Sequence, residues 1–214
     1  MGILFLILFI VSTAVHLYAS SKKDQKLRNI TKPFILLSLL GFYVFSASEI
    51  RIQIVLALIF SWLGDVLLMP KGNKWFSAGG VAFMISHLFF VLGYNEDIVF
   101  SAIPVWCIVF FAAAFAIAVS IIFSKLKEHL PKALFYPMFF YLLVNGTMNC
   151  FAIFRLLSNP CPATIITCIG AVLFFISDTS LFFVRFKKNS RLKTHFIVML
   201  TYSIGEILII CGLL

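Results

Sequence analysis

Long apolar runs follow one another along the whole chain, separated by short gaps that hold charged residues or Pro and Gly. Roughly 20 apolar residues cross the hydrocarbon core of a bilayer as an α-helix. The sequence contains eight candidate runs, at about residues 2–20, 33–48, 51–69, 75–94, 98–123, 133–156, 163–184 and 194–213. Eight spans use most of the 214 residues and leave no room for a separate soluble domain. We therefore predict an all-α, polytopic membrane helix bundle of eight transmembrane helices, with residues 1–214 forming a single transmembrane domain.

The composition supports this class and excludes several others. Hydrophobic residues make up 62% of the chain and charged residues 12%, whereas a soluble domain carries roughly 25% charged residues. The net charge of +9 does not indicate a nucleic-acid partner, because Lys and Arg occupy the gaps and not one folded basic face. The five Cys form no Cys-x-x-Cys pair, and the four His show no metal-ligand spacing. We expect no metal and no cofactor.

The basic residues predict the orientation of the bundle. The gaps after the first, third, fifth and seventh runs hold 15 of the 17 Lys and Arg residues, and the opposite side holds only Arg51 and Arg155. Because cytoplasmic loops carry an excess of Lys and Arg, these four gaps are expected in the cytoplasm. The number of spans is then even, and both termini are non-cytoplasmic. This topology fits either a bacterial inner membrane or an endoplasmic reticulum membrane.

Three of the eight acidic residues lie inside predicted spans: Asp65, Asp178 and Glu206. A carboxylate in the bilayer costs about 2.5–3.5 kcal/mol on insertion scales, which makes each acid a functional-site candidate. The alternative is a buried polar group that ties helices together by hydrogen bonds. Asp65 lies four residues before Met69 and Asp178 lies seven residues before Arg185, so their depths are roughly 6 and 10 Å. We predict that the two aspartates share a level in the cytoplasmic leaflet and form a catalytic pair.

Other polar residues collect on the same helix faces or at the same membrane edge. Tyr141, Asn145 and Asn149 repeat every four residues, as do Tyr202 and Glu206. Inter-helix hydrogen bonding explains each residue taken alone, whereas together they predict a polar cavity. The candidate substrate-binding residues are Lys32, Ser61, His87, Tyr136, Asn145, Ser177, Arg185, Tyr202 and Glu206.

The chemistry of two buried carboxyl groups admits more than one function. One can stay protonated as a general acid while its partner stays ionised, as glycosidases use them, and the same division would cleave an acid-labile ether on a lipid. The chain has neither the Gly-x-Ser-x-Gly motif of serine hydrolases nor the His-Glu-x-x-His motif of zinc hydrolases. A proton-coupled transporter of a lipid or small molecule also buries paired acids. A non-catalytic membrane scaffold is the third alternative.

Several segments in order along the chain resemble the YhhN-like lysoplasmalogenase family. The matching segments are Thr31-Lys32-Pro33, Ser61-Trp62-Leu63-Gly64-Asp65 continuing to Met69, Phe76-x-x-Gly79-x-x-x-Phe83-x-x-x-His87, Ser177-Asp178 with Arg185-Phe186, and Met199-Leu200-Thr201-Tyr202. The family usually has Gln four residues after this Tyr, whereas this chain has Glu206.

The resemblance implies an eight-helix hydrolase that cleaves the vinyl-ether bond of a lysoplasmalogen, giving a fatty aldehyde and a glycerophospho-head-group alcohol. On the paired acids we build the hypothesis that one of Asp65 and Asp178 protonates the vinyl ether, while the other stabilises the oxocarbenium ion and directs water to it. Lys32 and Arg185 would hold the phosphate of the lysophospholipid at the rim of a cavity open to the cytoplasmic leaflet. The hydrocarbon chain of this substrate would be lined by Phe residues and would run past Phe83 and His87 toward the middle of the bilayer formed by the membrane lipids.

Overall fold

The computed structural model describes residues 1–187 and 195–214. Within these residues the chain forms eight α-helices and no strand, which confirms the all-α prediction. The helices are α1 (Gly2–Ser21), α2 (Gln25–Ser46), α3 (Ile52–Leu67), α4 (Asn73–Asn95), α5 (Val105–Leu126), α6 (Phe135–Ser158), α7 (Pro162–Phe186) and α8 (His195–Cys211). Three single 3₁₀ turns, η1 (Phe100–Ala102), η2 (Lys127–His129) and η3 (Lys132–Leu134), lie on either side of α5.

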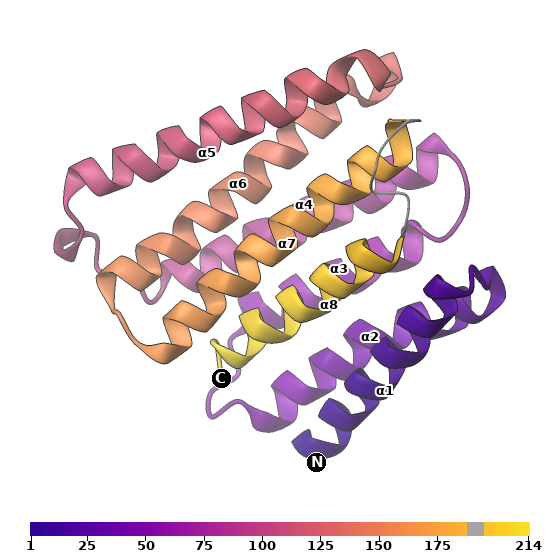
Figure 1. Cartoon of the computed structure of the whole chain (residues 1–214). Coiled ribbons are helices and arrows are strands. Elements are labelled where there is room, and N and C mark those ends of the chain that lie inside the picture. The colour runs from indigo at the N-terminus through magenta and orange to yellow at the C-terminus, as the bar shows by residue number, and fades with distance from the viewer. Residues whose placement is uncertain (188–194) are drawn as a thin grey trace.

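The helices run alongside one another in one bundle (Figure 1). The pair α5 and α6 lies at one edge, the pair α1 and α2 lies at the other, and α3, α4, α7 and α8 lie between them. The most extensive contacts join consecutive helices, namely α7 with α8, α1 with α2 and α3 with α4, and α4 also packs against α6. Both chain ends lie at the same end of the bundle, because Gly2 abuts Ser46 and the carbonyl of Leu213 accepts a hydrogen bond from Arg51.

Six of the described helices are long and apolar enough to cross a membrane: α1, α2, α4, α5 with its following turn, α6 with its preceding turn, and α7. The two others, α3 and α8, are apolar but have 16 and 17 residues. At 1.5 Å per residue they are roughly 24–26 Å long, against about 30 Å of hydrocarbon. The helices are those of a multi-pass membrane protein, while the count of eight spans and the non-cytoplasmic termini remain predictions.

The start of α2 corrects a predicted boundary. The helix begins at Gln25 and not at about residue 33, and its 22 residues make it long enough to span. Asp24 caps it, since its Oδ1 accepts a hydrogen bond of 3.0 Å from the backbone N–H of Leu27. Charge in residues 25–32 indicated a loop, but the segment forms two helical turns, and Pro33 lies inside the helix. Arg28 and Lys32 are therefore four residues apart on one helical face.

Two further boundaries differ from the prediction. The fifth helix begins at Val105 and not at about 98, because Pro104 precedes its first turn and residues 100–102 form η1. The eighth helix is described from His195. The predicted first residue, Thr194, and the predicted cytoplasmic charges Lys188, Arg191 and Lys193 lie outside the described residues.

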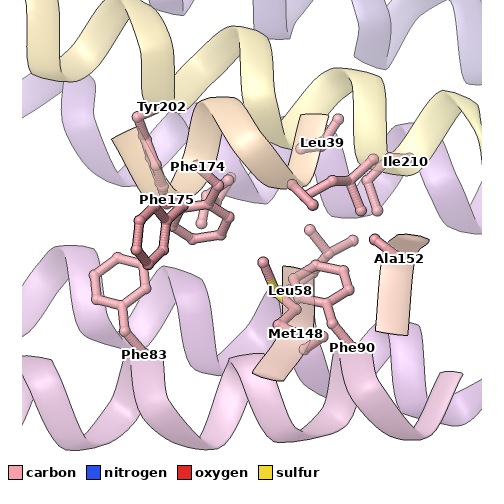
Figure 2. Packing of buried hydrophobic residues seen from close by; sticks show 14 of the residues in the cluster. Leu39, Leu58, Phe83, Phe90, Met148, Ala152, Phe174, Phe175, Tyr202 and Ile210 are labelled. Carbon is pink, nitrogen blue, oxygen red and sulfur yellow. The ribbon is translucent and has the colours of Figure 1, made fainter. Parts of the chain in front are cut away.

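Figure 2 shows two parts of one core cluster of buried side chains. The first joins α2, α3, α4, α6 and α8 through Leu39, Leu58, Phe90, Met148, Ala152 and Ile210. The second is largely aromatic and consists of Phe83, Phe174, Phe175 and Tyr202. Phe83 packs edge-on against Phe174 and Tyr202, with ring centroids 6.2 and 6.0 Å apart. This aromatic group connects α4, α7 and α8 close to both aspartates.

Glycines bring neighbouring helices together at two places that matter for the site. A Cβ atom on Gly64 would lie 2.5 Å from the ring of Phe83, so α3 approaches α4 closely one residue before Asp65. A Cβ atom on Gly170 would lie 2.7 Å from the carbonyl oxygen of Gly205, so α7 and α8 meet backbone to backbone. Small residues at such contacts allow helices to pack closely in a membrane.

An arginine cluster, consisting of Arg51, Asp97 and Arg155, closes the end of the bundle that holds the chain ends. Arg51 Nη1 lies 3.1 Å from both carboxylate oxygens of Asp97, and Arg155 Nε donates to Asp97 Oδ2 at 2.7 Å. The same arginines donate to the carbonyls of Leu213 (3.3 Å) and Gly212 (3.1 Å), just beyond α8. The two basic residues that the orientation argument places outside the cytoplasm are thus both paired with one acid.

Candidate functional site

A cavity of about 310 Å³ lies among α1, α2, α3, α4, α7 and α8. Asp65 and Asp178 both line it, so α3 and α7 do bring the two aspartates to one space. Five basic side chains also line it: His16 of α1, Arg28 and Lys32 of α2, Arg185 of α7 and His195 of α8. The site therefore combines two buried acids with three Lys and Arg side chains and two histidines, at the end of the bundle opposite the arginine cluster.

Asp65 is held by a cation and by a phenol. Its Oδ1 lies 3.0 Å from Lys32 Nζ, and its Oδ2 accepts a hydrogen bond of 2.9 Å from the hydroxyl of Tyr202. The carboxylate is buried, so the ion pair offsets the cost of removing its charge from water. Both oxygens of Asp65 are thus partnered, and these two partners favour its ionised form.

Asp178 has a different environment. Its Oδ2 accepts hydrogen bonds from the hydroxyl of Tyr141 and from Asn145 Nδ2, the latter at 2.8 Å. His87 Nε2 lies 3.6 Å from the same oxygen and is not hydrogen-bonded to it. Within the described residues, no Lys or Arg pairs with Asp178 and no hydrogen bond engages its Oδ1. The second oxygen is left free on a residue that lines the cavity.

The polar face of α6 orients Asn145 toward Asp178. Asn149 Nδ2 donates to Asn145 Oδ1 at 3.1 Å and to its backbone carbonyl at 3.0 Å. Because the amide oxygen of Asn145 is engaged in this way, its NH₂ group points to the carboxyl of Asp178. The residues repeating every four positions in the sequence therefore act together, with Tyr141 and Asn145 contacting the acid and Asn149 behind them.

The basic side of the cavity includes Arg185, which the sequence predicted, and three residues that it did not, namely His16, Arg28 and His195. Arg185 donates to the carbonyl of Gly72 at 3.2 Å and lies 4.2 Å above the centre of the Phe76 ring. Arg28 Nε and His16 Nε2 have no hydrogen-bond partner among the described residues. A helical reading of residues 25–32 would have found Arg28, because it lies one turn before Lys32. His16 and His195 gave no sequence signal, since each is a lone histidine at the edge of an apolar run.

Four residues that were predicted to bind substrate instead contact other protein groups near the cavity. Lys32, expected to hold a phosphate, is paired with Asp65. Ser177 lines the cavity, but its hydroxyl donates to the carbonyl of Val198 at 2.8 Å and so ties α7 to α8. His87 is fully buried beside Asp178 and does not line the cavity, while Asn145 contacts Asp178 directly.

Three others lie away from the cavity. Ser61 is fully buried and hydrogen-bonded to Ser86, 2.7 Å away. Glu206 is fully buried, and neither carboxylate oxygen has a hydrogen-bond partner among the described residues. Tyr136 is 69% exposed and lines a separate groove between α4 and α6. Among the described residues, no three His, Cys, Asp or Glu side chains are grouped to hold a metal ion.

A comparison with protein families identifies the chain. The model of the YhhN family matches residues 27–213. The chain belongs to the YhhN family. The match includes both aspartates, Lys32 and Arg185 but begins after α1, so His16 lies outside the segment that this YhhN protein shares with the family model. Comparisons with curated proteins and with solved structures gave no match.

Proposed function

We propose that this YhhN-family protein is a lysoplasmalogenase, a membrane hydrolase that cleaves the vinyl-ether bond of a lysoplasmalogen to a fatty aldehyde and a glycerophospho-head-group alcohol. Membership of the family is consistent with this activity. The observation that carries the proposal is the unequal pair of acids in one cavity, of which Asp65 has a cationic partner and Asp178 has none. Such a pair divides the roles of proton donor and anionic stabiliser.

The basic surround is suited to the phosphate of the head group. Arginine binds phosphate through several N–H donors in a fixed geometry, and Arg28 and Arg185 both line the cavity. The ammonium group of Lys32 has three N–H donors, so it can contact Asp65 and a phosphate oxygen together. In a lysoplasmalogen the vinyl ether is attached to the glycerol backbone, so a phosphate held by these residues brings the scissile bond toward the aspartates.

Asp178 is the proton donor in this mechanism. A carboxyl group that is buried without a cation is held at lower cost in its neutral form. Tyr141 and Asn145 both occupy Oδ2, so the proton is carried by Oδ1. Transfer of this proton to the vinyl-ether carbon remote from the ether oxygen gives an oxocarbenium ion and leaves Asp178 as a carboxylate.

Asp65 stabilises the cation, and water completes the reaction. The carboxylate of Asp65 is kept ionised by Lys32 and faces the same cavity. Water attacks the carbon next to the ether oxygen, and its proton passes to the Asp178 carboxylate, which restores the acid. The resulting hemiacetal collapses to the aldehyde and the free glycerol hydroxyl, with no net change in the enzyme.

The test is aldehyde release by the purified protein in detergent, with a lysoplasmalogen substrate and no ion gradient. Asp178→Asn and Asp65→Asn should each reduce turnover by about 10²–10⁴-fold, because Asn keeps the shape but cannot exchange a proton. Glu49→Gln is the matched control, since Glu49 is an exposed acid outside the cavity. Absence of aldehyde from the wild-type protein would leave a transporter of the same lipid as the alternative. Near-normal activity of either Asn variant would show that this aspartate is structural.

A further inference from the structure

A second hollow, which we call the lateral groove, lies between α4 and α6 and has a volume of about 350 Å³. Its α4 wall runs from Phe76 to Met84, a distance of roughly 12 Å along the helix. Its outer edge includes Val81, Phe140 and Tyr136, which are 46%, 53% and 69% exposed. The lining contains no charged residue and is almost entirely apolar. The groove therefore opens at the side of the bundle and suits a hydrocarbon ligand.

Three aromatic rings separate the lateral groove from the cavity. Phe76 lines both spaces, while Tyr141 and Phe182 line the groove. The centroid of the Phe182 ring lies 5.2 Å from that of Tyr141 and 6.1 Å from that of Phe76, both edge-on. Tyr141 presents its ring to the groove and donates its hydroxyl to Asp178. Asp178 is thus placed where a charged space and an apolar space meet.

We propose that the hydrocarbon chain of the substrate leaves the cavity sideways through this aromatic partition and lies in the lateral groove. This inference rests on the proposed function and adds the binding site of the chain. The vinyl ether is the junction between a phosphate-bearing head and a hydrocarbon chain. A molecule with its head among the basic side chains and its chain in the groove places that junction at Asp178. The proposed path requires the Phe182 ring to turn away from Tyr141 or from Phe76, against which it packs.

The path expected from the sequence, past Phe83 and His87 toward the bilayer middle, is filled. Phe83 is buried against Phe174 and Tyr202, and His87 is fully buried between Tyr141 and Phe174. Beyond them lie Ser61, Ser86 and Glu206, all fully buried. A hydrocarbon chain there would compete with packed aromatic rings and desolvate polar groups without replacing their contacts. A hydrocarbon chain in the lateral groove would neither displace these packed rings nor desolvate these polar groups.

Gly80 provides a selective way to block the lateral groove. It lines the groove, and a Cβ atom added to it meets no atom within 4 Å. The Cβ atom of Gly80→Phe therefore meets no atom of the protein, its ring extends from a position that lines the groove, and Phe is a better helix former than Gly. Ala113→Phe is the matched control, because Ala113 is an exposed residue of α5 outside the groove.

The experiment compares a long-chain (hexadecenyl) with a short-chain (butenyl) lysoplasmalogen analogue. In Gly80→Phe the added ring and the hydrocarbon chain of the long substrate would compete for the same space. We therefore expect this variant to lower kcat/KM for the long substrate by about tenfold or more. The short substrate and the Ala113→Phe control should be cleaved as by the wild type. If Gly80→Phe cleaves both substrates normally, the chain does not occupy the groove, although the hydrolase proposal stands.

A labelling measurement separates this inference from the activity itself. A non-hydrolysable lysophospholipid with a diazirine near the end of its chain is photolysed with the protein, and the labelled residues are found by mass spectrometry. Labels on α4 and α6 at Met84, Met138 or Tyr136, lost in Gly80→Phe and kept in Ala113→Phe, support the groove even if no aldehyde is released. Labels centred on Phe83 and His87, or unchanged by Gly80→Phe, overturn it.

Discussion

Removal of the Asp97 carboxylate should destabilise the protein measurably, because two arginines depend on it. Asp97 receives three N–H···O contacts of 2.7–3.1 Å from Arg51 and Arg155. The side chain of Arg155 is only 9% exposed, so it cannot turn to water when its partner is lost. In Asp97→Ala the guanidinium of Arg155 is therefore left buried without a counter-ion.

The magnitude follows from the burial of each partner. Removing one member of a fully buried ion pair costs about 3–5 kcal/mol, and hydrogen bonds to charged groups contribute about 1.5–3 kcal/mol. The Asp97 side chain is 34% exposed, so solvent screens part of its interaction. We expect Asp97→Ala to lower the free energy of unfolding by about 2–3 kcal/mol. The carbonyls of Gly212 and Leu213 remain as acceptors and limit the loss.

Thermal unfolding in detergent, followed by Trp fluorescence, measures this effect. Glu96→Ala is the matched control, since Glu96 is the neighbouring exposed acid and, among the described residues, accepts a side-chain hydrogen bond only from Gln53. A surface substitution of this kind changes stability by about 0.5 kcal/mol or less. The double variant Asp97→Ala with Arg155→Met should lose less than the sum of the two single variants. Equal unfolding temperatures for Asp97→Ala and Glu96→Ala would refute the argument that the cluster stabilises the bundle.

Three further predictions concern the site, the packing and the orientation. Arg185→Ala should raise KM with little change in kcat, whereas Lys32→Ala should also lower kcat because it removes the counter-ion of Asp65; steady-state kinetics on lysoplasmalogen separate the two. Gly170→Ala should lower the unfolding temperature, because its Cβ would lie 2.7 Å from a backbone oxygen of α8, while Gly80→Ala should not; an unchanged Gly170→Ala would contradict the close helix contact. A reporter fused after Leu214 should read as non-cytoplasmic, and a cytoplasmic signal would overturn the predicted topology.

The sequence was sufficient to predict the helices and the acids because both depend on local chemistry. Long apolar runs predict spanning helices, and a carboxylate within such a run is costly enough to indicate a site. The ends of the helices were less predictable. Charge in residues 25–32 indicated a loop, but the segment is helical, with a cap at Asp24 and with Lys32 paired with Asp65.

The parts of the site that escaped prediction depend on which helices are neighbours. Depth along a helix suggested that Asp65 and Asp178 lie at one level, but it could not show that Lys32 pairs with one of them and not with the other. His16 reaches the cavity only because α1 contacts α8 and packs on α2. Tyr136 was assigned by depth alone, and its exposure on the outer side of α6 could not be read from its position in the sequence.

The arginine cluster also bears on the order in which the bundle is assembled. The hairpins α1–α2, α3–α4 and α7–α8 are contacts between successive helices, so each can form soon after it is synthesised. The bonds from Arg155 to Gly212 and from Arg51 to Leu213 join residues 57 and 162 positions apart. They can close only after α8 has been made and has docked. Until then the two guanidinium groups lack these two carbonyl acceptors, and Asp97 is the acid that joins Arg51, just before α3, to Arg155 of α6.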